Sequence, residues 1–330
     1  MKMWKRMIAM LLAMLLTFSC AYAETPVDEE AEMASYQQDD TVMDPSEEVI
    51  FQDSAAEEYL DGALAAVNEM QNILLLGIDA RPGEKSGRSD TMIILTVDAE
   101  NNVIRMVSLM RDLYVEIPGY KNNRLNAAYV FGGPELLMKT IKKNFGIEVE
   151  NYVAVNFSML ADLIDQIGGL ELEVESDYYV DRINAVIKCD NAVLGIDKND
   201  GLLTEPGLQL MTGKQAQAYA RYRYGTKDGD FGRTQRQREV IMKIIDKLSE
   251  KSIIELFRLA GDNMENVYTN LTFEQITELV PAVLNLKGAT MEQLRIPMDG
   301  AYESKTISKM SVLVPDRTKT KKAIAEFYGK

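Results

Sequence analysis

Short apolar runs alternate with longer amphipathic stretches over most of the chain. Two unbroken apolar runs, residues 72–78 and 91–97, are typical of strands that are buried on both faces. A third run, Val103–Leu109, follows the turn residues Asn101 and Asn102, so the second and third runs are predicted to form a hairpin. Further strands are predicted at residues 152–157, 170–174, 293–296 and 312–314.

Helical periodicity fills the spaces between these runs. It predicts a helix over residues 127–145, interrupted by Gly132, Gly133 and Pro134, and a helix over 158–167 that ends at two glycines. Other helices are predicted at residues 213–222, 233–248, 253–260, 273–286 and 316–327. Because strands and helices alternate, we expect an α/β fold, a mixed central β-sheet covered by helices on both faces in one domain.

The N-terminus carries an export signal. Lys2, Lys5 and Arg6 precede an apolar run over residues 7–18, and Ala21-Tyr22-Ala23 matches a signal-peptidase site. Residues 1–23 are therefore predicted to be a signal peptide or, if uncleaved, a membrane anchor. Lipidation of Cys20 is a third possibility, although the residues before it lack the leucine of a lipoprotein box.

An acidic tether is predicted between this leader and the folded domain. Residues 24–61 hold fourteen acidic residues and no basic one, too few large apolar side chains to form a core, and no periodicity. We place the tether at residues 24–70 and a single domain at 71–330. The net charge of −15 arises mainly in the tether, so the domain has no basic face and no nucleic-acid partner is expected.

The sequence contains no histidine. This excludes Ser-His-Asp and Cys-His nucleophile arrangements as well as histidine-ligated zinc sites. Any acid–base step is therefore left to a carboxylate, a lysine, a tyrosine or water.

Charged residues flank the first three predicted strands. Asp79 follows the first strand, Arg88-Ser89-Asp90 precedes the second, and Arg111-Asp112 follows the third. In an antiparallel hairpin, the start of one strand lies beside the end of the other, so Asp90 and Arg111 are predicted to be neighbours. An ordinary ion pair at a strand end is the alternative interpretation.

A fourth charged stretch is rich in arginine. It runs from Tyr219 to Gln237, with Arg221 and Arg223 near the end of one predicted helix and Arg233 and Arg236 in the first turns of the next. Arginine at a helix start opposes the helix dipole, so the cluster favours an anion over a solvated surface. Arginine forks match phosphate oxygens, and nearby carboxylates suggest a divalent cation, so the pattern points to a pyrophosphate with a metal ion.

These stretches belong to a longer series of motifs. In order, the series is Gly77-Ile78-Asp79, Gly87 to Met92, Ser108 to Asp112, Arg124 to Tyr129 with Gly132-Gly133, Ile167 to Leu170, Leu210 to Gln237, and Val312 to Asp316. Taken together it resembles the LytR-CpsA-Psr family of exported, usually membrane-anchored bacterial proteins. Met110 stands where that family usually has proline, and Arg124 where lysine is commoner.

The resemblance implies a phosphotransferase at the outer face of the cytoplasmic membrane or in the cell wall. Such an enzyme moves a teichoic acid or capsular polysaccharide from an undecaprenyl-pyrophosphate carrier to the 6-hydroxyl of muramic acid in peptidoglycan. The isoprenoid tail would need an apolar tunnel, whose lining cannot be told from core residues in the sequence.

Site roles follow from the same resemblance. Asp79 and Asp90 would lie at Mg²⁺, and Asp90 would activate the attacking hydroxyl, with Arg111, Arg221 and Arg223 as its catalytic partners. The residues implied to bind pyrophosphate are Arg88, Arg111, Arg221, Arg223, Arg233, Arg236 and Gln237. Two other functions use the same residues: a polyprenyl-phosphate binding or regulatory protein without turnover, and a pyrophosphatase acting on the same carrier.

Overall fold

The computed structural model describes residues 49, 60, 64–68, 70–79, 88–98, 101–222, 229–252, 255, 259, 267–272, 275 and 290–329. The predicted leader, most of the predicted tether, and most of the helices predicted at 253–260 and 273–286 lie outside these residues. Within them, no helix is both long enough and apolar enough to span a membrane.

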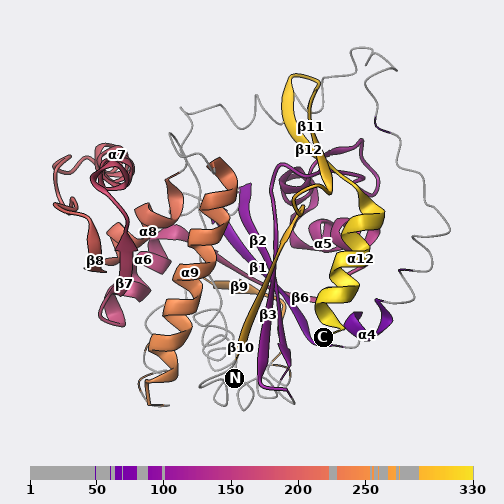
Figure 1. Ribbon diagram of the computed structural model, residues 1–330, viewed down its shortest axis with the longest axis horizontal. Coiled ribbons are helices and arrows are strands. Elements are labelled where there is room, and N and C mark those ends of the chain that lie inside the picture. Colours follow the sequence, from indigo (N-terminus) through magenta and orange to yellow (C-terminus); the bar gives the residue numbers. More distant parts are fainter. Residues whose placement is uncertain are drawn as a thin grey trace.

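A six-stranded mixed sheet forms the centre of the molecule (Figure 1). Its strands are β1 (Asn72–Asp79), β2 (Arg88–Asp98), β3 (Val103–Leu109), β6 (Asn151–Asn156), β9 (Val267–Thr269) and β10 (Thr290–Ile296). They lie in the order β10-β3-β2-β1-β6-β9. The pairs β1–β6 and β3–β10 are parallel, and the other neighbours are antiparallel. The predicted hairpin of the second and third strands is confirmed, with the turn at Asn102 in the left-handed region (φ 54°).

Three two-stranded sheets surround the central one. They pair β4 (Tyr114–Val115) with β5 (Asn123–Arg124), β7 (Leu170–Val174) with β8 (Gly207–Met211), and β11 (Tyr302–Ile307) with β12 (Met310–Pro315). The predicted strand at 170–174 therefore exists but lies outside the central sheet. The β11–β12 hairpin projects from the top of the molecule in Figure 1.

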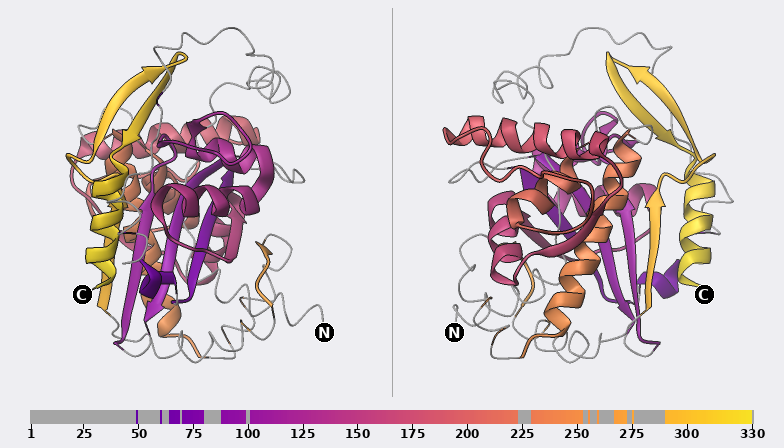
Figure 2. Two further views of the ribbon diagram at one scale, coloured as in Figure 1. Left: turned by 90° about the vertical axis from the view of Figure 1, so that its right-hand side faces the viewer. Right: turned by 60° about the vertical axis from the view of Figure 1, so that its left-hand side comes forward.

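Helices cover both faces of the central sheet, as predicted. They are α4 (Ala65–Asn68), α5 (Leu125–Phe145), α6 (Phe157–Gln166), α7 (Asp177–Leu194), α8 (Gly213–Arg221), α9 (Gly229–Ser249) and α12 (Arg317–Tyr328). Alternate residues of β1 point to opposite faces: Ile73 and Leu75 pack in one core with α6 to α9, whereas Leu74 and Leu76 pack in a second core with α5 and α12. The two layers are visible in Figure 2.

The folded part begins before residue 71. Leu64 and Val67, just before and within α4, are buried in the core that contains α5 and α12. The Asn68 side chain donates to the carbonyl of Gly146 at 3.2 Å and accepts from the amide of Glu148 at 2.8 Å. These contacts fix the chain at the start of β1, which the acidic composition of the preceding residues did not indicate.

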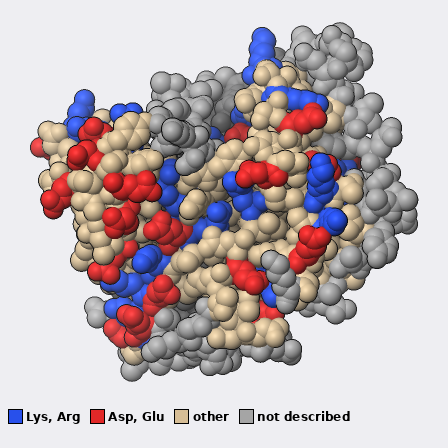
Figure 3. All heavy atoms as spheres, viewed as in Figure 1, with Lys and Arg blue, Asp and Glu red and all other residues tan. Residues whose placement is uncertain are grey.

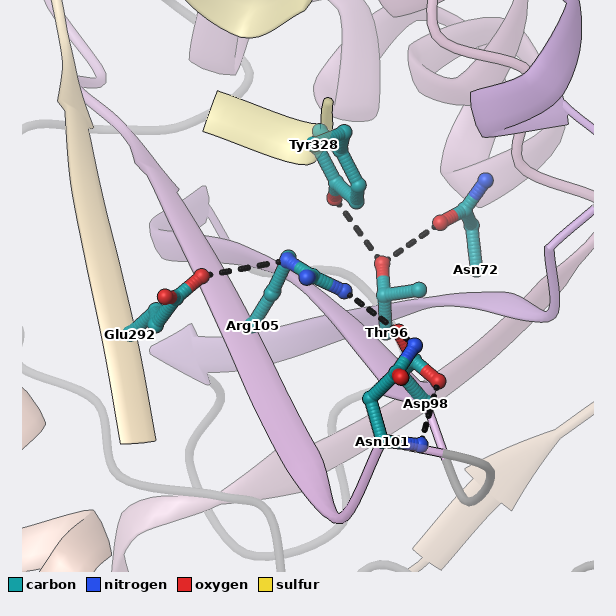
Figure 4. A network of polar contacts seen from close by, with 7 residues as sticks. All are labelled: Asn72, Thr96, Asp98, Asn101, Arg105, Glu292 and Tyr328. Atoms are coloured by element: carbon teal, nitrogen blue, oxygen red, sulfur yellow. Dashed lines mark hydrogen bonds and ion pairs between the residues drawn. The ribbon is translucent and has the colours of Figure 1, made fainter. Parts of the chain in front are cut away.

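A buried polar network closes one end of the sheet (Figure 4). The Thr96 hydroxyl donates to Asn72 Oδ1 at 2.6 Å and lies 2.8 Å from the Tyr328 hydroxyl at the end of α12. Nearby, Arg105 donates to Asp98 at 2.9 Å and to Glu292 of β10 at 3.1 Å. The network thus joins β1, β2, β3, β10 and α12 at the end of the hairpin where Asn101 and Asn102 turn.

Candidate functional site

The strand pairing places Asp90 on a β-bulge. Across β1 and β2, Gly77 pairs with Thr91 and Ile78 pairs with Ser89, so Asp90 is the extra residue between two register partners. A bulge bends the strand and redirects the side chain of its extra residue. Asp90 therefore leaves the regular alternation of the sheet at the end where β1 finishes and β2 begins.

Asp90 and Arg111 are in contact, as the hairpin geometry predicted. Arg111 Nη1 donates to Oδ1 and Oδ2 of Asp90, at 2.9 Å each. The Asp90 side chain is 5% exposed and that of Arg111 is 15% exposed. A carboxylate removed from water to this extent needs a charged partner, which Arg111 supplies.

The Asp90–Arg111 pair is continued by further side chains of alternating charge. Arg111 Nε lies 3.7 Å from Asp112, and Asp112 lies 3.3 Å from Nε of Arg124, which opens α5 as its N-cap. The backbone carbonyl of Arg111 also accepts from the amide of Asn126, at 3.3 Å. The motif from Arg124 onward is thereby attached to the end of β3, next to Arg111.

Helix α9 packs against the same edge of the sheet. Arg238 donates to Gln293 of β10 at 2.6 Å and to the hydroxyl of Ser108 of β3 at 3.2 Å. Ser108 precedes Arg111 by three residues. Burial, together with neighbouring Arg295, lowers the pKa of Arg238 to about 10, which leaves it charged at neutral pH. Figure 3 shows Lys and Arg side chains gathered in the middle of the face on which α9 lies.

The predicted start of this helix is wrong, and with it the helix-dipole argument. Helix α9 includes Gly229, so Arg233 and Arg236 lie one and two turns inside it rather than at its first positions. The dipole acts mainly within the first turn, so it does not disfavour arginine there. The glycine-rich stretch from Asp228 to Gly232 had suggested a loop, but Gly229 to Gly232 belong to the helix.

Arg236 fastens α8 to α9. Its Nε donates to the carbonyl of Tyr219 at 3.1 Å, its Nη2 donates to the carbonyl of Tyr222, and its guanidinium lies 3.6 Å from the centre of the Tyr222 ring. These contacts satisfy carbonyl groups at the C-terminal end of α8. Arg236 thus positions the end of the helix that carries Arg221.

Arg221 pairs with an acidic residue that sequence reasoning missed. Its Nη1 lies 2.6 Å from Asp190 of α7. Burial raises the pKa of Asp190, and Arg221 partly opposes this effect. The segment 175–194 received no helix prediction, because its apolar residues are separated by many charged ones, although the spacing of Val180, Ile183 and Ile187 was a usable signal.

Arg233 and Gln237 occupy one face of α9, one turn apart. Both are 1% exposed. Neither amide atom of Gln237 has a hydrogen-bond partner among the described residues, and the same holds for the buried hydroxyl of Ser89, next to Asp90. Buried polar groups are normally paired, so these atoms are candidates for hydrogen bonds to a polar ligand.

Some of the predicted site residues lie partly or wholly outside the described part. Asp79 and Arg88 are register partners at the ends of β1 and β2, which places their backbones beside the Asp90 bulge. Their side chains, and all of Arg223, are not among the described residues. Among the residues that are, no three acidic or cysteine side chains are grouped to hold a metal ion.

Comparison with known proteins matches most of the chain to one family of bacterial proteins. The model of the LytR_cpsA_psr family matches residues 25–326. The regulatory protein MsrR of Staphylococcus aureus (strain COL) is 32% identical over 261 residues, covering 78% of this chain and 73% of MsrR. The polyisoprenyl-teichoic acid–peptidoglycan teichoic acid transferase TagU of Bacillus cereus is 32% identical over 238 residues, covering 71% and 70%.

Solved structures agree in fold. A structure of TagT bound to LIIa-WTA has a TM-score of 0.62 and 28% identity, with 80% of this chain and 92% of that chain covered. A structure of the LytR-CPS2A-psr family protein YwtF (TagT) with bound octaprenyl pyrophosphate lipid has a TM-score of 0.58 and 25% identity, with 80% and 92% covered. The predicted mixed sheet in a single domain is thereby confirmed.

Proposed function

The chain belongs to the LytR-CpsA-Psr family, and on that premise we propose that it is an exported glycopolymer–peptidoglycan phosphotransferase. Its donor would be a teichoic acid or capsular polysaccharide on an undecaprenyl-pyrophosphate carrier, and its acceptor the muramic acid 6-hydroxyl at the outer face of the cytoplasmic membrane or in the cell wall. The transferase name of TagU and the octaprenyl pyrophosphate held by YwtF support this choice of substrates.

One observation carries the proposal. Asp90 sits on a bulge, nearly buried, with both carboxylate oxygens on Arg111. An ion pair that only stabilised a strand end would not require a bulge, nor would it be flanked by the unpaired buried hydroxyl of Ser89. A carboxylate beside guanidinium groups is suited to accept a proton next to a bound phosphate.

The proposed step transfers a phosphoryl group. The acceptor hydroxyl oxygen forms a bond to the phosphorus that carries the glycopolymer, and the bond from that phosphorus to the bridging oxygen breaks. The products are a phosphodiester joining polymer to muramic acid, and the polyprenyl monophosphate. Asp90 takes the hydroxyl proton, and Arg111, Arg221 and Arg233 offset the charge on the phosphate oxygens, with Arg88, Arg223, Arg236 and Gln237 completing or supporting the pocket.

Magnesium fits the donor set that this step provides. Mg²⁺ uses one or two protein carboxylates together with substrate phosphates and water, so a cluster of three acidic residues is not required. Asp90 and Asp79, on adjacent strands, would supply the protein oxygens. When bound, the ion neutralises pyrophosphate charge. Asp90 meanwhile keeps its place through the hydrogen bonds from Arg111.

Two related functions remain as competing outcomes. One is a polyprenyl-phosphate binding or regulatory protein without turnover, and the name of the regulatory protein MsrR favours its regulatory form. A pyrophosphatase would use the same side chains with water as the nucleophile. Binding of the carrier requires the arginines, whereas proton acceptance requires Asp90.

The deciding experiment uses the purified full chain, a polyprenyl-pyrophosphoryl oligosaccharide and a muropeptide acceptor, with Mg²⁺ present or chelated. We expect a glycan–muropeptide product and polyprenyl monophosphate. Asp90→Asn should reduce the rate by about 100-fold or more while donor binding persists. Asp200→Asn, which alters an aspartate paired with Lys214 at 2.5 Å far along the chain, is the matched control. Monophosphate without the joined product would indicate a pyrophosphatase, and binding without either product would indicate a carrier-binding protein.

A further inference from the structure

A row of aromatic rings leads from the protein surface to the arginine cluster. Tyr178, at the start of α7, is 44% exposed. Its ring centre lies 5.5 Å from that of Tyr179, which lies 5.7 Å from that of Tyr222. Tyr222 in turn packs under the guanidinium of Arg236 and follows Arg221 directly. The exposed end of the row is thus two rings away from residues proposed to bind pyrophosphate.

Several polar side chains close to Tyr178 in the sequence have no hydrogen-bond or ion-pair partner among the described residues. Arg182, one turn along α7, lies over the Tyr178 ring at 5.3 Å, and its buried Nε has no hydrogen-bond partner among the described residues. Glu175, Asp177 and Asp181 are exposed and likewise take part in no ion pair within the described part of the chain. The lobe that contains α7 is rich in Asp and Glu in Figure 3.

This combination matches the chemistry of a sugar ring. An aromatic face packs against the C–H groups of a pyranose, and carboxylates and a guanidinium bond its hydroxyls. The acidic surroundings disfavour a phosphate-rich ligand at this place. The core alone does not require Tyr178, because the buried contacts of α7 are made by Val180, Ile183 and Ile187.

We propose that Tyr178 and Arg182, with the neighbouring acidic residues of the same segment, form a subsite for an uncharged hexose-type sugar. Helix α7 packs against α8, so the subsite lies beside α8 rather than within the phosphate site itself. The inference rests on the proposed function, which supplies two sources of the sugar. They are the glycan attached to the pyrophosphate and the glycan of the acceptor.

The test compares ligands with and without sugar on the full chain. Tyr178→Ala should weaken binding of a polyprenyl-pyrophosphoryl disaccharide about three- to tenfold, and leave binding of sugar-free polyprenyl pyrophosphate unchanged. Tyr178→Phe, which keeps the ring, should behave like the native protein. Tyr268→Ala, which removes a tyrosine that is 47% exposed on β9, is the control and should change neither affinity.

A second arm identifies the acceptor as the source. If Tyr178→Ala instead raises the KM for a muropeptide by a similar factor, with kcat unchanged, the subsite holds the acceptor glycan. The subsite is refuted if Tyr178→Ala leaves both carrier affinities and the KM for the muropeptide at their native values. This conclusion holds even when Asp90→Asn abolishes transfer.

Failure of the proposed function has a different signature. Saturation-transfer NMR with a free hexose disaccharide needs neither carrier nor turnover. A signal that Tyr178→Ala removes would keep the sugar subsite even if no carrier bound. The absence of both that signal and a sugar-dependent carrier affinity would overturn it.

Discussion

Arg111 holds Asp90 through a single nitrogen that donates to both carboxylate oxygens, at 2.9 Å each. Because the Asp90 side chain is only 5% exposed, removing its partner would leave a buried charge uncompensated. We expect Arg111→Ala to lower the free energy of unfolding by about 3 kcal/mol in urea denaturation. Adding Asp90→Asn should restore part of this loss.

The control for this double-mutant cycle is an exposed pair. Lys142 and Glu148 form an ion pair with side chains that are 56% and 39% exposed. Lys142→Ala should cost less than about 1 kcal/mol, since water screens such pairs. Strictly additive effects of the Asp90 and Arg111 substitutions would contradict the coupling that the short contacts indicate.

Replacing Gln237 by an apolar residue should stabilise the protein and weaken carrier binding. Its buried amide has no partner among the described residues, and an unpaired buried polar group costs about 1–3 kcal/mol. Gln237→Met removes that cost at similar volume, so we expect a higher melting temperature together with weaker carrier binding. The matched change Gln215→Met should lower the melting temperature instead, because Gln215 completes the capping box of α8 with Thr212. A lower melting temperature for Gln237→Met would show that its amide is satisfied within the protein.

The pair Arg221–Asp190 gives a pH-dependent prediction. Burial raises the pKa of Asp190, and the charges of Arg221 and Lys214 oppose the rise. A raised carboxyl pKa favours the protonated form in the folded protein, so its contribution is present at low pH and is lost as pH rises through the folded pKa. Arg221→Ala removes the main opposing charge and should raise this pKa further.

The stability deficit of Arg221→Ala should therefore grow as the pH rises from acidic to neutral, because the Asp190 carboxyl then loses its proton with no Arg221 beside it. Urea unfolding of native protein and variant at an acidic and a neutral pH measures it. In the variant Arg221→Ala/Asp190→Asn, the pH dependence of the deficit should vanish. A deficit that is equal at both pH values in Arg221→Ala would mean that Asp190 stays ionised without Arg221.

The hairpin and its consequence were readable from the sequence, whereas the long-range partners were not. Unbroken apolar runs around the turn at Asn101 and Asn102 dictate antiparallel pairing, and this alone brings Asp90 to Arg111. The bulge that sets Asp90 apart depends on a one-residue register difference, which alternation patterns do not encode. Asp190 could not be assigned to Arg221 because their contact spans 31 residues and two helices.

Helix boundaries near the site also escaped prediction, for a local reason. Gly229 and Asp230 are poor helix formers, yet both lie within α9. Tertiary packing overrides propensity here, since Phe231 lies under the guanidinium of Arg295 at 4.2 Å and beside the ring of Tyr302 at 5.8 Å. A sequence pattern contains the preference of each residue but not the β10 and β11 side chains that outweigh it.

Replacing Thr96 should lower stability without changing catalysis. Its hydroxyl bridges Asn72 and Tyr328 at the turn end of the β2–β3 hairpin, six residues along β2 from Asp90, or roughly 20 Å at about 3.3 Å per residue. Thr96→Val keeps the shape but leaves two buried polar groups without their partner, so it should cost about 1–3 kcal/mol in urea unfolding. Thr91→Val, on the same strand beside the Asp90 bulge, is the comparison.

At a temperature where both variants are folded, Thr96→Val should retain the native kcat and KM for transfer. The network that this change disrupts holds α12 in place and does not contact the proposed phosphate site. Tyr328→Phe should lose less stability than Thr96→Val, because the hydroxyl of Thr96 can still donate to Asn72. Burial raises the pKa of Tyr328 to about 12, so its neutral form is favoured in the folded state and this contribution is lost above pH 10. Equal stability loss in Thr96→Val and Tyr328→Phe would mean that Asn72 takes no part in the clamp.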